Sequence, residues 1–227
     1  MTSDQSSNPP PFPILFDIGD VLLKVDFLAS LSRIFPDPPA DLPARFAKVL
    51  EHKDELETGR MAPDAFLDEA IETLGFAGPR EEFLAAWLDV FEPIMPMWRT
   101  VADLSAAGHR LILFSNTNAL HMDDALRRYA PLFRHFPEAV FSHKVGSMKP
   151  DEPMYRHAIE TFGLDPARTL YIDDLPENIA TGKRLGFRSW QYDAARHDEF
   201  LGWLAETQCR GAECPSMSTI RQTEIPH

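Results

Sequence analysis

Short apolar runs, most of them separated by helical segments, restrict the fold of this sequence more than any other feature. The runs lie at residues 14–16, 111–114, 139–141 and 170–172, with a weaker one at 189–192. Continuous apolar runs are typical of strands covered on both faces. Helical patterns at residues 119–129, 152–162 and 176–185 separate the last four. This alternation predicts an α/β fold with a doubly wound parallel sheet and right-handed crossovers.

A long insertion separates the first predicted strand from the second, and it is too long for a loop. We expect residues 25–96 to form a helical cap domain over the carboxyl edge of the sheet, where ligands bind in open α/β folds. Residues 14–24 and 97–207 then form the core domain. The insertion and the return to the sheet show amphipathic helical patterns at residues 27–35, 42–52, 63–74, 80–91 and 97–107.

The two ends of the chain are polar. Residues 1–13 are rich in Pro, Ser and Asn, and residues 208–227 are aperiodic. Such segments bury too little apolar area to offset their ordering entropy, so we expect a flexible N-terminal arm and a flexible C-terminal tail. Cys209 and Cys214 could pair or bind a metal, but no second pair of ligands completes a zinc site, and we expect reduced thiols.

The charge of the chain argues against several classes of partner. Lys and Arg number 22 against 35 Asp and Glu, which gives a formal net charge of -13 and no basic cluster to attract nucleic acid. No stretch approaches the roughly 18 apolar residues of a membrane span, and residues 1–10 do not resemble a signal peptide. We therefore expect a cytoplasmic monomer or homodimer without nucleic-acid or membrane partners.

Four polar motifs follow predicted strands and can reach the same edge of the sheet. FDIGDV carries Asp17, FSNTN carries Ser115 at a donor-rich helix start suited to anions, and GSMKP carries Lys149. YIDDLPEN places Asp173 and Asp174 side by side, and hard divalent cations prefer such oxygen ligands. Taken singly, each motif also fits turn chemistry, helix capping or a solvated lysine.

Together the four motifs resemble those of the haloacid dehalogenase-like superfamily: a nucleophilic Asp, a Ser or Thr, a Lys and an acidic pair. The resemblance runs from Ile14 to about Thr207 and includes a helical cap between the first two motifs, as in C1-capped members. More narrowly, ELETGRM, HRLILFSNTN, GSMKPDEPMY and YIDDLPENI look like the bacterial sugar-phosphate phosphatases that include glucose-1-phosphate phosphatase.

The resemblance implies a Rossmann-like core and a Mg²⁺-dependent phosphatase that acts on a small phosphorylated metabolite. Asp17 would attack phosphorus and form an aspartyl-phosphate. The ion would be held by the Asp17 carboxylate, the Gly19 carbonyl and Asp174, with Asp173 acting through a bound water.

The same resemblance implies a set of phosphate-binding groups. Ser115, the Asn116 backbone amide and Lys149 would hold the equatorial phosphate oxygens. Lys149 would also reduce the repulsion between Asp17 and a dianionic substrate.

Gly19 departs from the family pattern, which places a second Asp there to protonate the leaving oxygen and later activate water. Two explanations stay open. Either Asp20, Glu57 or His121 supplies the proton, or the substrate has a good leaving group that needs little help. An anomeric sugar phosphate fits the second explanation, and on this ground we favour sugar 1-phosphates.

Substrate selection is expected in the cap, which closes over the leaving group and excludes water. The candidates are Glu57, Arg60 and Met61 from the cap, with Asn118 and His121 from the core. A solvated or helix-capping role is an equal alternative for each of them.

Two other functions remain as alternatives. A haloacid dehalogenase also uses an Asp nucleophile without the second Asp, but it needs no metal, so the pair Asp173 and Asp174 argues against it. A non-catalytic member that binds a phosphorylated ligand would explain Gly19, but such a protein has little use for Asp17 facing a phosphate.

Overall fold

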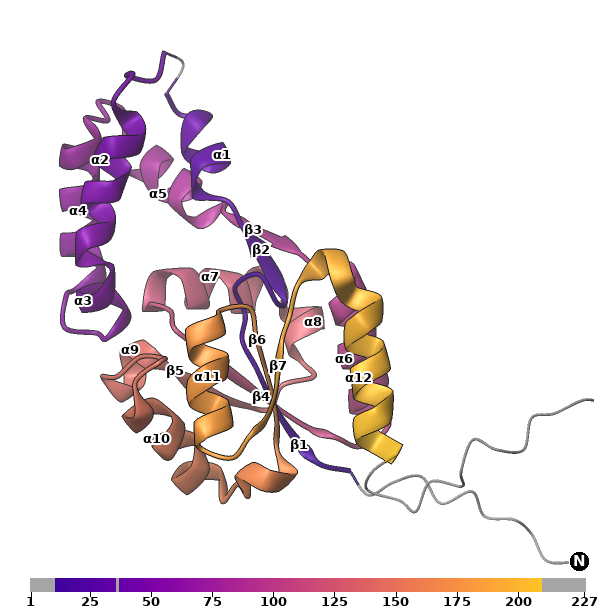
Figure 1. Cartoon of the computed structure of the whole chain (residues 1–227). Coiled ribbons are helices and arrows are strands. Elements are labelled where there is room, and N and C mark those ends of the chain that lie inside the picture. Colours follow the sequence, from indigo (N-terminus) through magenta and orange to yellow (C-terminus); the bar gives the residue numbers. More distant parts are fainter. Residues whose placement is uncertain (1–10, 36, 210–227) are drawn as a thin grey trace, which may run out of the picture.

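A five-stranded sheet forms the centre of the computed structural model, which describes residues 11–35 and 37–209 (Figure 1). The strand order is β5-β4-β1-β6-β7, and all pairings within it are parallel. Each predicted strand is present, so the predicted α/β fold with a parallel sheet is confirmed. The strands are β1 (Pro13–Phe16), β4 (Arg110–Ser115), β5 (Glu138–Phe141), β6 (Leu170–Asp173) and β7 (Arg188–Gln191).

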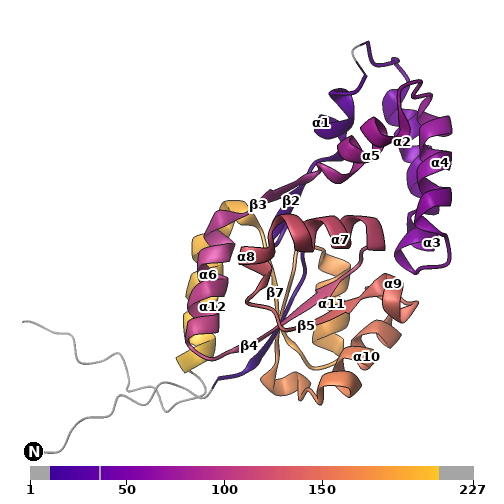
Figure 2. The same cartoon turned by 180° about the vertical axis from the view of Figure 1, so that it is seen from behind.

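The central strand β1 is buried on both faces because helices cover the sheet on either side (Figures 1 and 2). Side chains alternate along a strand, so Ile14 and Phe16 pack on one side and Leu15 on the other. The first side is covered by α6 (Met95–Ala106), α7 (Ala119–Arg128), α8 (Ala130–Phe133) and α12 (His197–Cys209), and the second by α10 (Glu152–Phe162) and α11 (Pro176–Arg184).

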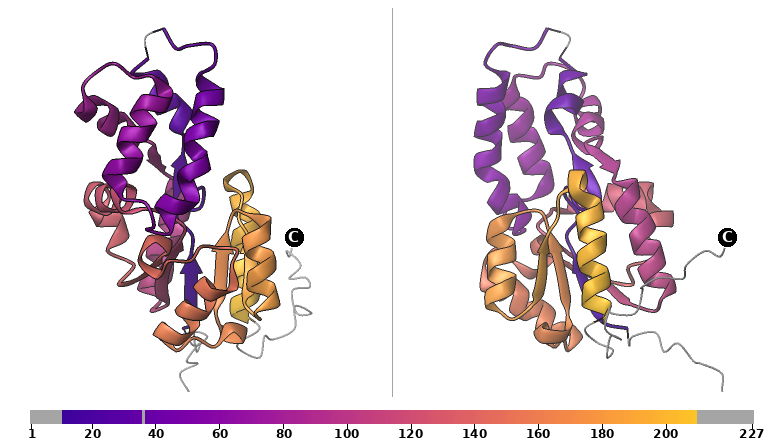
Figure 3. Two further views of the ribbon diagram at one scale, coloured as in Figure 1. Left: turned by 90° about the vertical axis from the view of Figure 1, so that its left-hand side faces the viewer. Right: turned by 45° about the vertical axis from the view of Figure 1, so that its right-hand side comes forward.

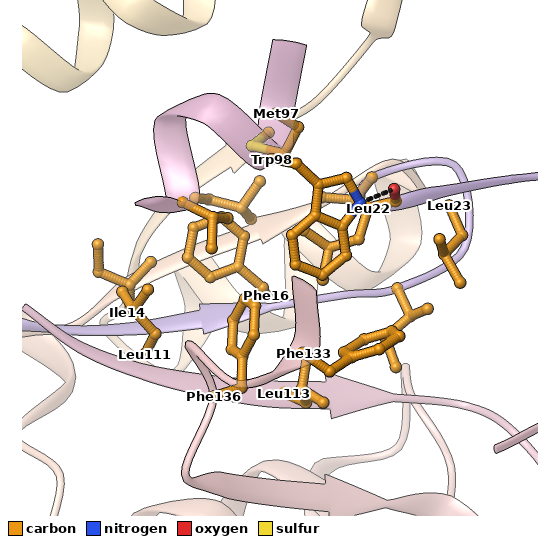
Figure 4. Close-up of a cluster of buried hydrophobic side chains, with 14 of the residues drawn as sticks. Ile14, Phe16, Leu22, Leu23, Met97, Trp98, Leu111, Leu113, Phe133 and Phe136 are labelled. Atoms are coloured by element: carbon orange, nitrogen blue, oxygen red, sulfur yellow. Dashed lines mark hydrogen bonds between the residues drawn. The ribbon is translucent and has the colours of Figure 1, made fainter. Parts of the chain in front are cut away.

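The chain that leaves β1 is fixed by a buried tryptophan on α6 (Figure 4). The Trp98 indole nitrogen donates a hydrogen bond of 2.8 Å to the Leu22 carbonyl, and its ring packs edge-on against Phe133 and Phe136. This contact holds the segment after β1 against the core, close to the edge of the sheet where the site residues lie.

An antiparallel ribbon of two short strands, β2 (Leu23–Val25) and β3 (Phe91–Pro93), joins the core to a group of helices. These helices lie beyond one end of the sheet (Figure 3). They have their own apolar cluster, which includes Leu31, Phe83 and Trp87. The division into a core of residues 14–24 and 97–207 and a cap of residues 25–96 stays a prediction. The helices are α1 (Phe27–Ser32), α2 (Leu42–Val49), α3 (Lys53–Glu57), α4 (Pro63–Leu74) and α5 (Arg80–Leu88).

The ribbon corrects one sequence prediction. Residues 80–91 were expected to form a single helix, but α5 ends at Leu88 and Phe91 lies in β3. Three-residue strands are too short to show a period of two, so the pattern gave no sign of them. The structure also contains short elements that were not predicted: α3, α8, α9 (Ser142–Val145) and the one-turn 3₁₀ helices at Pro166–Arg168 and Ala194–Arg196. The helix predicted at residues 42–52 is divided into α2 and a 3₁₀ turn at Leu50–His52.

The end of α3 approaches the core closely at Gly59. This residue has φ of +72°, and a Cβ atom there would lie 2.5 Å from the His143 carbonyl oxygen in α9. Glycine is therefore required here both for the left-handed backbone and for the close contact. The contact holds the carboxyl end of α3 beside the site described below.

The ends of the described region differ slightly from the predicted arms. Strand β1 begins at Pro13, and α12 continues to Cys209, so both extend into segments expected to be flexible. The expectations for residues 1–10 and for Cys214 lie outside the described residues. Within residues 11–35 and 37–209, no helix has the length and apolar character needed to cross a bilayer.

Candidate active site

Three carboxylates converge at the carboxyl ends of β1 and β6. Asp17 follows β1, while Asp173 ends β6 and Asp174 comes next in the chain. The two strands are parallel neighbours, and the Asp17 amide donates to the Ile172 carbonyl at 2.9 Å. One oxygen from each carboxylate lies within 4.8 Å of the others. The structure thus brings together three acidic side chains that are distant in sequence.

Lys149 is the buried cation of this group, with a side chain that is 0% exposed. Its Nζ donates to Asp173 Oδ2 at 2.6 Å and to the Phe114 carbonyl at 2.8 Å. Nζ also lies 2.9 Å from Asp17 Oδ1, but this ion pair lacks the alignment of a hydrogen bond, and Oδ1 has no other partner among the described residues. Burial alone lowers the pKa of Lys149, but Asp17 and Asp173 outweigh it and raise the pKa above its usual value.

Asp173 uses both of its oxygens within the protein. Oδ2 accepts from Lys149 and, at 2.6 Å, from the Tyr171 hydroxyl, while Oδ1 accepts from the Leu175 amide at 3.0 Å and from Asn178 Nδ2 at 2.9 Å. The residue is 0% exposed. Asp173 therefore lies beside the expected metal position, but its contacts anchor Lys149 and leave it little capacity to bind an ion directly.

The local electrostatics favour an additional cation. Burial, with a contribution from Asp173, raises the pKa of Asp17 to about 6 even though Lys149 acts in the opposite direction. Burial, Asp17 and Asp173 raise the pKa of Asp174 to about 7. Three carboxylates thus share one lysine, and Asp17 Oδ1 is buried without a hydrogen bond. A hard divalent cation with oxygen ligands fits this donor set.

Ser115 and Asn116 bring the second motif to the same place. Ser115 ends β4 and is buried, and its hydroxyl donates to the Asn116 carbonyl at 3.3 Å. Ser115 also contributes to lowering the pKa of Asp17. Asn116 forms two hydrogen bonds with the Lys149 backbone, donating from Nδ2 to the carbonyl at 2.7 Å and accepting at Oδ1 from the amide at 2.8 Å. The Asn116 side chain therefore holds the Lys149 loop in place, a role that the sequence did not indicate.

A cavity of about 280 Å³ between the core and the cap is lined by these residues, except Asp173. Besides the residues above, its polar lining includes Lys53 and Glu57 of α3. Glu57 is 8% exposed, and its Oε2 accepts from Lys53 Nζ at 2.7 Å. The apolar part of the wall consists of Ile18, Val25, Phe27, Phe91, Met122 and Leu175. The cavity is therefore suited to a small ligand with one anionic end.

His121 lies in the cavity wall, but both of its ring nitrogens have partners. Nε2 lies 2.9 Å from the Trp87 carbonyl, and Nδ1 lies 3.0 Å from Asn118 Nδ2. This pairing fits a neutral ring that donates from Nε2 and accepts at Nδ1. Burial lowers the pKa of His121 to about 4. The structure therefore argues against the interpretation of His121 as a proton donor.

Asn118, Arg60 and Met61 are not among the residues that line this cavity. Asn118 caps α7, where its Oδ1 accepts from the His121 amide at 3.1 Å. Arg60 is exposed, and Met61 packs against the apolar cluster of the cap. For Asn118, the helix-capping alternative describes the observed contacts.

Comparison with known proteins identifies the family of this chain. The family model for haloacid dehalogenase-like hydrolases matches residues 14–186. The chain belongs to the haloacid dehalogenase-like hydrolases. The resemblance stated from the four motifs is therefore confirmed at the level of the family.

Several members of this family are similar over most of their length. The D-ribitol-5-phosphate phosphatase of Bacteroides thetaiotaomicron is 28% identical over 186 residues, which cover 78% of this chain and 90% of the relative. Among solved structures, a HAD family enzyme from the same organism has a TM-score of 0.74 at 22% identity, covering 85% of this chain and 98% of its own. A HAD-like family hydrolase from Porphyromonas gingivalis has a TM-score of 0.70 at 28% identity, covering 86% and 98%.

The departure from the family pattern at Gly19 leaves Asp20 as the next acidic residue in the motif. Asp20 is exposed and has φ of 49°. Its amide donates to the Leu23 carbonyl at 2.7 Å, and its Oδ1 accepts from the Val25 amide at 3.2 Å. Asp side chains tolerate the left-handed backbone and bond to nearby amides in turns. Asp20 therefore shapes the turn into β2.

The sequence interpretation did not include Lys53, the partner of Glu57. The two residues are four positions apart on one helical turn, and that spacing commonly places a lysine and a glutamate side by side. The signal was present in the sequence, but the predicted helical pattern ended at residue 52 and no element was predicted for residues 53–57, where α3 lies.

Proposed function

We propose that this protein is a Mg²⁺-dependent phosphomonoesterase that hydrolyses a small phosphorylated metabolite through an aspartyl-phosphate on Asp17. The observation that carries the proposal is the position of Asp17: it lines the cavity, its Oδ1 lies 2.9 Å from Lys149 Nζ, and one of its oxygens lies within 4.8 Å of oxygens of Asp173 and Asp174. A carboxylate held in this way is suited to attack an electrophile that carries negative charge.

The relatives support the proposal. One is a phosphatase by name, and the HAD family enzyme from B. thetaiotaomicron has been crystallised with magnesium and inorganic phosphate. That complex has a TM-score of 0.72 to this chain at 22% identity and covers 82% of this chain.

The metal would be held by the Asp17 and Asp174 carboxylates and the Gly19 carbonyl, with Asp173 anchoring Lys149 beside them. The fit rests on the unbonded Asp17 oxygen and on carboxylates whose pKa values are raised. When bound, Mg²⁺ supplies positive charge that offsets the repulsion between Asp17 and a phosphate dianion.

The chain's own groups then perform two displacements. Asp17 forms a bond to phosphorus while the bond from phosphorus to the leaving oxygen breaks. The phosphoryl oxygens are held by Ser115, the backbone amide of Asn116 and Lys149. Ser115 and Lys149 are buried, and buried donors stabilise charge more strongly than exposed ones. Water then attacks phosphorus, the bond to Asp17 breaks, and inorganic phosphate leaves.

Metal removal tests this function directly. We expect hydrolysis of p-nitrophenyl phosphate in the presence of Mg²⁺, and loss of that activity in EDTA with recovery on adding Mg²⁺. The measurement is release of p-nitrophenol. Halide release from 2-chloropropionate in EDTA, without hydrolysis of p-nitrophenyl phosphate, would instead support the dehalogenase alternative.

The substrate is proposed to be a small sugar or polyol phosphate. If no other residue replaces the acid missing at Gly19, sugar 1-phosphates are favoured, because they have a better leaving group. The name of the ribitol-phosphate relative adds a second class, phosphates of primary alcohols. Both classes have the size and the single anionic end that a cavity of about 280 Å³ with one phosphate-binding end requires.

Comparing sugar 1-phosphates with phosphates of primary alcohols shows whether another residue replaces the acid missing at Gly19 or whether the substrate has a good leaving group. Without an acid in the protein, the values of kcat/KM for terminal phosphates should fall about 10²- to 10⁴-fold below those for sugar 1-phosphates. With an acid, the two classes should be hydrolysed at comparable rates. We expect this result because a further carboxyl group, that of Glu57, lines the cavity. The measurement is phosphate release under matched conditions.

A further inference from the structure

The cavity contains few groups that could exchange a proton with a leaving oxygen. Among the described residues that line it, the ionisable ones outside the nucleophile, its lysine and the proposed metal ligands are Asp20, Lys53, Glu57 and His121. His121 has partners at both ring nitrogens, and Asp20 bonds to the backbone of its own turn. The lysine and the glutamate of α3 remain.

Glu57 has the features of an acid–base residue. It is the last residue of α3 and is largely buried, with a side chain that is 11% exposed. Oε2 accepts from Lys53, and the described residues form no hydrogen bond to Oε1. Burial raises the pKa of Glu57, and Lys53 acts against this change. A carboxyl group in such surroundings changes protonation state more readily near neutral pH than an exposed one.

We propose that Glu57 is the acid–base residue of the hydrolysis and takes the role that the family pattern assigns to the residue at position 19. This inference rests on the proposed function. In the first displacement, the Glu57 carboxyl group gives its proton to the leaving oxygen as the bond from that oxygen to phosphorus breaks. In the second, the Glu57 carboxylate takes a proton from the attacking water as the new bond to phosphorus forms.

Lys53 is a positioning residue for Glu57 in this scheme. It is on the same face of α3 and is much more exposed, with a side chain that is 47% exposed. Its hydrogen bond holds Oε2 and leaves Oε1 as the oxygen available for the substrate. Because α3 belongs to the cap, the acid is in place only when the cap lies against the core, where Gly59 contacts His143. Proton transfer is thereby linked to exclusion of water.

The test compares Glu57→Gln with the wild-type enzyme on a series of aryl phosphates whose phenols become progressively weaker acids, and on D-ribitol 5-phosphate. Good leaving groups need no proton, so kcat/KM for p-nitrophenyl phosphate should change little. The loss should grow along the series and reach about 10²-fold or more for the weakest acids. Glutamine keeps the shape of the side chain, and Glu57→Asp should restore part of the activity on weakly acidic leaving groups.

A second readout follows the covalent intermediate. If Glu57 also activates water, Glu57→Gln should release a burst of p-nitrophenol equal to the enzyme concentration, followed by slow turnover as the aspartyl-phosphate accumulates. A structural role for Glu57 would not produce a burst.

The matched control is Glu55→Gln, on the same helix and exposed to solvent next to His52. It should match the wild type on every substrate. Asp20→Asn should also show no dependence on the leaving group. The proposal is overturned if Glu57→Gln loses the same factor on all substrates, loses nothing, or if Asp20→Asn shows the growing loss instead. Failure of the proposed function differs from all of these, since the wild-type enzyme would then hydrolyse none of the phosphates.

Discussion

Replacing Asp17 with asparagine is expected to reduce kcat for p-nitrophenyl phosphate by about 10⁴- to 10⁶-fold, the order of loss seen when the nucleophile of a covalent mechanism is removed. Asparagine is nearly the same size, so it should fit the buried position, but it cannot form the acyl-phosphate bond. The measurement is steady-state release of p-nitrophenol at saturating Mg²⁺.

The fold of the Asp17→Asn variant should survive, because the metal-free protein already disfavours a charge on Asp17, as its pKa of about 6 indicates. Its melting temperature without Mg²⁺ is therefore expected to equal or exceed that of the wild type. Asp20→Asn is the matched control: asparagine also tolerates the left-handed backbone, and activity should persist. Full hydrolytic activity in Asp17→Asn would remove the basis of the proposed mechanism.

Replacing Lys149 with methionine is expected to lower both activity and stability. Lys149 is wholly buried between Asp17 and Asp173, so its removal leaves two carboxylates in a poorly solvated site without their cation. Removing one partner of a buried ion pair costs about 3–5 kcal/mol in the free energy of unfolding. Loss of a preorganised charge at the reacting group reduces kcat by about 10²- to 10³-fold. Urea unfolding without Mg²⁺ measures the first effect and p-nitrophenyl phosphate turnover the second.

Two further variants separate charge from packing at Lys149. Lys144→Met removes an exposed lysine from the neighbouring short helix α9 and should change the free energy of unfolding by less than about 0.5 kcal/mol. Adding Asp17→Asn to Lys149→Met should recover part of the lost stability, because one uncompensated charge is then removed. A Lys149→Met protein as stable and as active as the wild type would show that the lysine is dispensable.

The position of the main site could be predicted because it depends on rules that act locally. Continuous apolar runs identified β1, β4, β5 and β6, and the motifs of Asp17, Ser115 and Asp173 lie at or directly after the end of a strand, whereas the motif of Lys149 follows the short helix α9. In a parallel sheet the carboxyl ends of neighbouring strands meet at one edge, so Asp17 and Asp173 had to lie near each other once their strands were paired.

The partner of each polar side chain could not be predicted in the same way. The sequence made His121 a candidate proton donor. In the structure its Nε2 lies 2.9 Å from the Trp87 carbonyl of α5, a residue far away in the chain. Asp173 was expected near the metal, but the Tyr171 hydroxyl and Asn178 complete its hydrogen bonds together with Lys149. These contacts depend on which buried donors lie nearby, and that is decided by packing between segments far apart in the chain.

The sequence by itself determined the five strands of the sheet, the main helices between them and the edge of the sheet where the four motifs meet, since these follow from hydrophobic periodicity and parallel pairing. The tertiary structure alone decided which ionisable groups line the cavity and which protonation state each of them favours. The ribbon of β2 and β3 brings the cap helices over that edge, and the close contact at Gly59 holds Glu57 in the cavity wall. Burial and opposing charges, which no local pattern encodes, then fix the protonation of these groups.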